Sequence, residues 1–126
     1  MTTEDKKKIL IVEDDEKLLR ILDNEFSDHG FDVFKAENGR EGLDVAFAEH
    51  PDVILLDIVM PVMHGMDMLK ELREDEWGKN AEVIILTNLS DSERIAKAVE
   101  YGTSDYLTKT KWSVEDLIKM VESKIK

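Results

Sequence analysis

The length, composition and charge of this chain exclude several classes of protein. Its 126 residues are enough for one domain with a single buried core. The 29 acidic residues outnumber the 17 Lys and Arg residues, and the formal net charge of -12 repels phosphate backbones and anionic lipid, so we expect no direct binding to nucleic acid or membrane. The absence of cysteine excludes disulfides, thiolate catalysis and cysteine-based zinc sites.

The first residues, 1–7, are polar and rich in lysine, so we expect a polar N-terminal tail rather than a signal peptide. The apolar runs of the chain are far shorter than the stretch of about 20 residues that a membrane helix needs. A cytoplasmic location is therefore the default expectation.

Apolar runs and amphipathic segments alternate after this tail. The run 9–12 predicts a first strand. Leu18, Leu22 and Phe26 then recur at helical spacing and predict a first helix, which Gly30 closes.

The middle of the chain repeats this alternation. A second strand is predicted over 31–36, and the capping box at 38–41 predicts the start of a helix. The His-Pro-Asp segment at 50–52 ends that helix before a third strand over 53–56. A third helix is predicted to follow Gly65.

Two further strand–helix pairs complete the chain. We expect a fourth strand over 83–86, a helix capped by 90–93, a fifth strand over 106–108 and a last helix capped by 113–116. Runs such as 83–86 show no polar alternation, which is typical of strands buried on both faces.

These five β-α units predict an α/β fold with helices on both faces of a parallel sheet. Right-handed crossovers lead to a doubly wound, flavodoxin-like three-layer sandwich. We expect a five-stranded sheet in the order 2-1-3-4-5. This order places the first and third strands side by side, together with the acidic residues that follow them.

Polar side chains follow four of the predicted strands at the point where each strand ends. They are Glu13-Asp14-Asp15, Asp57, Thr87 and Lys109. Because the carboxyl ends of parallel strands share one edge of the sheet, these groups are expected to converge there. In open α/β sheets ligands bind in the crevice at that edge.

Glu13, Asp14 and Asp57 predict a cation site. Clustered carboxylates repel one another and remain ionised when a cation joins them. Magnesium suits such oxygen ligands, and neither cysteine nor paired histidines are present for a softer metal. The alternative is that Asp14 or Asp15 only caps the first helix, but the polar residues at the other strand ends favour the metal site.

Four segments together resemble the receiver domain of two-component response regulators. They are 9–15, 56–61 with Gly65, 86–87 and 105–109, in the order and spacing of that family over residues 8–125. The resemblance implies one receiver domain over 8–126. It also implies that Asp57 accepts a phosphoryl group from the phosphohistidine of a histidine kinase or phosphotransfer protein.

The resemblance assigns roles to the other strand-end residues. It implies that Asp14 binds Mg²⁺ directly, Glu13 through water, and Val59 through its backbone carbonyl. Asp57 would be the nucleophile, and Lys109 would neutralise charge on the phosphoryl oxygens.

The resemblance also implies a switch. A hydrogen bond from Thr87 to the phosphoryl group would draw in the loop after the fourth strand and let Tyr106 swing inward. The surface around the fourth helix and fifth strand would then change for a downstream protein target, which the sequence does not identify.

Three positions depart from the family pattern. Thr110 follows Lys109 where a proline usually stands, so the sequence does not favour the family's cis peptide there. Asn88 stands where a small residue is common, which narrows access to the predicted phosphoacceptor. Trp112 has no assigned counterpart.

Two other functions are compatible with the same residues. A Mg²⁺-dependent phosphohydrolase using an aspartyl-phosphate is disfavoured, because Val59 stands where a second carboxylate would act as acid and base. A degenerate receiver used only for docking is disfavoured by the intact acids, Thr87 and Lys109. We therefore expect a phosphoacceptor that assists its own phosphorylation and dephosphorylation, and not a turnover enzyme.

Overall fold

The computed structural model of the chain describes residues 6–57, 65–87, 105–108 and 113–125. One parallel sheet runs through the molecule in the order β2-β1-β3-β4-β5. Its strands are β1 (Lys8–Val12), β2 (Asp32–Ala36), β3 (Val53–Asp57), β4 (Val83–Thr87) and β5 (Asp105–Thr108). The α/β class and the predicted strand order are confirmed.

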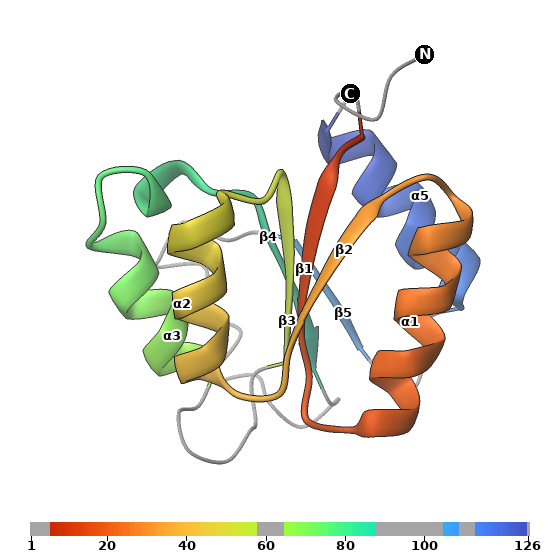
Figure 1. Cartoon of the computed structure of the whole chain (residues 1–126), viewed down its shortest axis with the longest axis horizontal. Helices are drawn as coiled ribbons and strands as arrows, with labels where there is room; N and C mark the ends of the chain where they lie inside the picture. Colours follow the sequence, from red (N-terminus) through yellow and green to blue (C-terminus); the bar gives the residue numbers. More distant parts are fainter. Residues whose placement is uncertain (1–5, 58–64, 88–104, 109–112, 126) are drawn as a thin grey trace.

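Helices cover both faces of the sheet (Figure 1). They are α1 (Glu16–Asp28), α2 (Gly39–Glu49), α3 (Gly65–Arg73) and α5 (Val114–Ile125), with a short 3₁₀ helix, η2 (Gly78–Asn80), before β4. The helix predicted after 90–93 lies outside the described residues. Within the described part, no helix combines the length and the apolar character that crossing a membrane requires.

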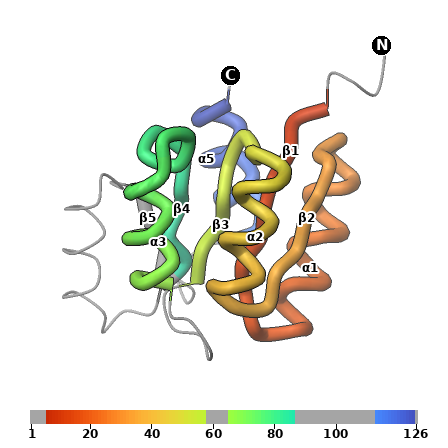
Figure 2. The backbone as a smooth tube through the Cα atoms, turned by 60° about the vertical axis from the view of Figure 1, so that its left-hand side comes forward, coloured from red at the N-terminus to blue at the C-terminus, as the bar shows by residue number. Residues whose placement is uncertain are grey.

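Two hydrophobic cores lie on the two faces of the sheet. Alternate strand residues such as Leu10 and Leu56 pack with α2 and α3 on one face. Their neighbours Ile11 and Leu55 pack with α1 and α5 on the other face. Figures 1 and 2 show these two pairs of helices on opposite faces of the sheet. The apolar runs show no alternation because both of their faces are buried, and this burial supplies most of the driving force for folding.

α1 ends in a chain reversal at Gly30, as the sequence predicts. Gly30 has a φ of 86°, in the left-handed region. Its N–H donates to the carbonyl of Ser27, and the N–H of Phe31 donates to the carbonyl of Phe26, each at 3.0 Å. The Phe26 and Phe31 rings meet edge to face at 5.3 Å, which completes a Schellman motif with its apolar contact.

Both ends of α2 lie where the sequence predicted them. Asn38 caps its start by accepting a hydrogen bond from the Glu41 N–H at 2.9 Å, as the capping box indicates. His50 ends it in the left-handed region, and its ring stacks on that of Trp77 at 4.3 Å. Phe47, near the end of this helix, is 41% exposed.

One bound of each of the five strands differs from its predicted position by one residue, and in the last two strands β4 extends to Thr87 and β5 begins at Asp105. Phe31 lies in the turn that follows α1, where its N–H donates to the carbonyl of Phe26, so β2 begins at Asp32. Lys8 joins β1 because it pairs with Asp32. Asp57 joins β3 because it pairs with Leu86 of β4, which places it inside the strand that was predicted to end one residue earlier.

Candidate functional site

Three carboxylates lie together at the carboxyl edge of the sheet. Glu13 directly follows β1 and Asp57 ends β3, two strands that pair through Val12 and Leu56. Glu13, Asp14 and Asp57 each offer an oxygen, and these oxygens all lie within 4.8 Å of one another. Glu13 is 0% and Asp57 4% exposed, whereas Asp14 is exposed. The predicted convergence of these three acids is therefore present in the structure.

The turn between β1 and α1 determines which acid caps the helix and which acid joins the acidic group. The Glu13 N–H donates to the carbonyl of Ala36 at 3.0 Å, which ties the turn to the end of β2. Asp15 caps α1, because its Oδ1 accepts hydrogen bonds from the N–H groups of Lys17 and Leu18. Asp14 is therefore not the cap, and its carboxylate belongs to the acidic group.

This group has the chemistry of a site for a hard divalent cation. Its donors are all carboxylate oxygens, which Mg²⁺ and Ca²⁺ prefer. Two of the acids are buried, where mutual repulsion and desolvation are costly without a compensating charge. The exposed Asp14 leaves one side open to water, and Mg²⁺ usually retains several waters. Among the described residues, no other group of three such side chains is as close.

Of the remaining predicted site residues, Thr87 and Tyr106 lie in described strands, and the others lie outside the described ranges. Thr87 ends β4 and pairs with Thr108 of β5, so its backbone reaches the same edge as Asp57. Tyr106 lies in β5, where it pairs with Ile85. The predictions for Val59, Asn88, Lys109, Thr110 and Trp112 concern residues outside the described ranges.

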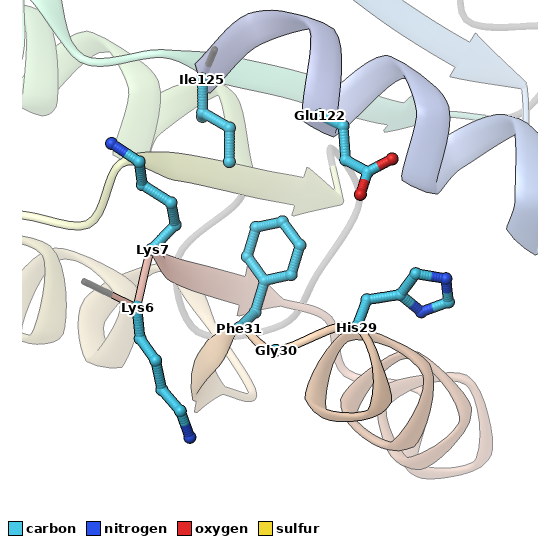
Figure 3. Close-up of a pocket in the computed structure, with 7 residues that line it drawn as sticks. All are labelled: Lys6, Lys7, His29, Gly30, Phe31, Glu122 and Ile125. Atoms are coloured by element: carbon cyan, nitrogen blue, oxygen red, sulfur yellow. The ribbon is translucent and has the colours of Figure 1, made fainter. Parts of the chain in front are cut away.

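Two hollows in the described part of the structure have none of the three acids in their lining. One, of about 270 Å³, lies beside α1 and β2 and includes Arg20 and Lys35 in its lining. The other, of about 230 Å³, lies at the opposite edge of the sheet and is lined by residues that include Lys6 and Ile125, the first and last that the structure describes. Figure 3 shows the rings of Phe31 and His29 and the side chain of Ile125 around this second hollow.

Comparison with known proteins defines the class to which this fold and site belong. Residues 9–122 match the response regulator receiver domain, and the chain belongs to that family. The resemblance found in the sequence is thereby confirmed.

Curated relatives include larger regulators. The chain is 39% identical over 105 residues to the probable transcriptional regulator ycf27 of Porphyridium aerugineum, covering 82% of this chain and 42% of that protein. It is 30% identical over 116 residues to the response regulator ArlR of Staphylococcus aureus strain Mu50, covering 92% of this chain and 51% of that protein. The chain therefore spans about half the length of these relatives.

Solved receiver domains have the same fold. A Francisella response regulator receiver domain is 33% identical with a TM-score of 0.85, covering 95% of this chain and 97% of that one. The receiver domain of a sensor histidine kinase from Pseudomonas aeruginosa is 25% identical with a TM-score of 0.85, covering 95% and 98%. That structure has a magnesium ion coordinated in its active-site cleft.

Proposed function

We propose that this chain is a phosphoacceptor switch in a two-component phosphorelay, with Asp57 as the residue that is phosphorylated. The observation that carries the proposal is the group formed by Asp57, Glu13 and Asp14 at the carboxyl edge of the sheet. The match to the receiver domain family supports it, as does the magnesium ion in the cleft of the Pseudomonas relative.

The proposed reaction is an in-line phosphoryl transfer. A carboxylate oxygen of Asp57 attacks the phosphorus of a phosphohistidine on a histidine kinase or phosphotransfer protein. The new P–O bond makes an acyl phosphate as the P–N bond breaks, and the departing imidazole takes up a proton. Bound Mg²⁺, held by Asp14, Asp57, Glu13 and the Val59 carbonyl, would supply positive charge to the phosphoryl oxygens.

Residues of this chain would position the phosphoryl group and respond to its presence. Burial of Asp57 within β3 fixes the direction of its carboxylate. Lys109 would add a second positive charge, and Thr87 would hydrogen-bond a phosphoryl oxygen. The chain then acts stoichiometrically through a protein target, and not as a turnover enzyme.

The proposal is tested by labelling with a small acyl phosphate. Incubation with acetyl phosphate and Mg²⁺ should add one phosphoryl group, measured by intact-mass spectrometry, and excess EDTA should prevent it. If labelling is slow, beryllofluoride with Mg²⁺ should shift the amide resonances of residues near Asp57. Equal labelling in EDTA would contradict the metal-dependent mechanism, and continuous release of phosphate would favour a phosphohydrolase.

Replacing Thr87 by Ala should separate phosphorylation from switching. The variant should still be labelled at Asp57, because Thr87 gains its partner only when the phosphoryl group is present. Its amide shifts in β5 should be weaker than those of the wild type, and Thr87→Ser should restore them by restoring a hydroxyl. Full wild-type shifts in phosphorylated Thr87→Ala would contradict this coupling.

A further inference from the structure

The Asp15 side chain is turned into α1. Its backbone is extended, with φ −79° and ψ 106°, and its Oδ1 accepts hydrogen bonds from Lys17 N at 3.0 Å and Leu18 N at 3.3 Å. Its carbonyl accepts the first hydrogen bond of the helix, from Leu19 N at 2.9 Å. Three contacts from α1 therefore hold the side chain and the carbonyl of Asp15, and with them the backbone of this residue.

The N–H of the same residue contacts one of the three acids. The Asp15 N–H donates to Glu13 Oε2 at 3.1 Å. The Glu13 backbone is held at its other side by Ala36 of β2. Glu13 is completely buried, so its carboxylate must be oriented by such contacts and not by solvent.

We propose that Asp15 is a positioning residue for the divalent-cation site. By capping α1 it directs its own N–H at Glu13, and this N–H orients the Glu13 carboxylate toward the space that it shares with Asp14 and Asp57. Asp15 is not among the clustered acids, yet the affinity for Mg²⁺ depends on its side chain. The inference rests on the proposed Mg²⁺-dependent function.

The alternative is that Asp15 acts only through its negative charge. Charge and capping can be separated because Asn and Ser also cap helices, although they are neutral. Asp15→Asn and Asp15→Ser keep an acceptor for the α1 N–H groups, whereas Asp15→Ala removes it. A capping role predicts that Asn and Ser remain close to wild type, and a charge effect predicts that all three variants lose affinity alike.

The experiment is a calorimetric Mg²⁺ titration of the unphosphorylated protein. Asp15→Ala should raise the Kd for Mg²⁺ about 10-fold, the lower end of what loss of an outer contact to a metal ligand causes. Asp15→Asn and Asp15→Ser should bind much more nearly like wild type. Ser113→Ala is the matched control: it removes the Oγ that accepts from Asp116 N at the start of α5, a helix without a residue in the acidic group.

The outcomes are distinct. Unchanged affinity in Asp15→Ala, or equal losses in the Ala and Asn variants, would overturn the positioning role. An equal loss in Ser113→Ala would also overturn it, because the effect would then follow from weaker helix capping in general. Absence of Mg²⁺ binding by the wild type would instead reject the metal-dependent proposed function on which the inference rests.

Discussion

Asp57→Asn is expected to abolish phosphoryl labelling and, in the absence of Mg²⁺, to make the protein more stable. The first effect follows because an amide is not a nucleophile for phosphorus under these conditions. The second follows from the position of Asp57, which is 4% exposed and lies close to Glu13 and Asp14. Removing one charge from this group lowers the repulsion in the folded state.

The expected gain in the free energy of unfolding is on the order of 1–2 kcal/mol, because existing contacts of Asp57 offset part of the repulsion. Thermal unfolding with and without Mg²⁺ measures it. Mg²⁺ should raise the Tm of the wild type and raise that of Asp57→Asn much less, since a ligand that binds only the folded state stabilises it.

Asp44→Asn is the matched control for Asp57→Asn. Asp44 is an exposed acid of α2, outside the acidic group, so the same chemical change should alter neither labelling nor the response of Tm to Mg²⁺. Wild-type labelling of Asp57→Asn would mean that another residue accepts the phosphoryl group. A lower Tm of that variant without Mg²⁺ would mean that the three acids do not destabilise the folded protein.

The strands were predictable from sequence because each one carries a signal that does not depend on its neighbours. Unbroken apolar runs such as 53–56 indicate strands buried on both faces, and the parallel order then brings their ends together. The meeting of Glu13 with Asp57 follows from these two facts alone. Gly30 was equally predictable, because a left-handed residue after a helix favours glycine.

Other features depend on contacts between distant segments. Asp14 and Asp15 are equally good capping residues by type, and only the path of the turn after Glu13 decides that Asp15 is the cap. The role of the Asp15 N–H was missed for the same reason, although a strong cap two residues after Glu13 was a usable signal. The stacking of His50 on Trp77 joins two loops, and neither loop indicates its partner.

Gly78→Ala is expected to be more destabilising than the same change at Gly30 or Gly42. A Cβ at Gly78 would overlap the backbone carbonyl oxygen of Leu72, which cannot move aside as a side chain can. The Gly78 peptide is also held on both sides. Its N–H donates to Asp75 Oδ2 at 2.9 Å, and its carbonyl accepts from Arg73 Nη1 at 2.7 Å.

Arg73 makes this turn hard to shift. Its Nη1 also donates to the carbonyl of Ala81 at 2.8 Å, so one guanidinium joins two points of the segment before β4. Desolvation by partial burial lowers the pKa of Arg73, and the nearby Glu82 opposes that shift. Moving Gly78 away from Leu72 would leave a partly buried charge with poorer hydrogen bonds, which adds to the cost of the overlap.

The expected cost of Gly78→Ala is about 3 kcal/mol in the free energy of unfolding, at the upper end for overpacking. Urea denaturation measures it from the midpoint, provided that the slope is unchanged. Gly30→Ala is the control: a Cβ there meets nothing within 4 Å, so only the φ of 86° is unfavourable, and the cost should be about 1 kcal/mol. A Gly78→Ala cost no larger than that of Gly30→Ala would mean that the turn relaxes freely and that the Arg73 contacts do not restrain it.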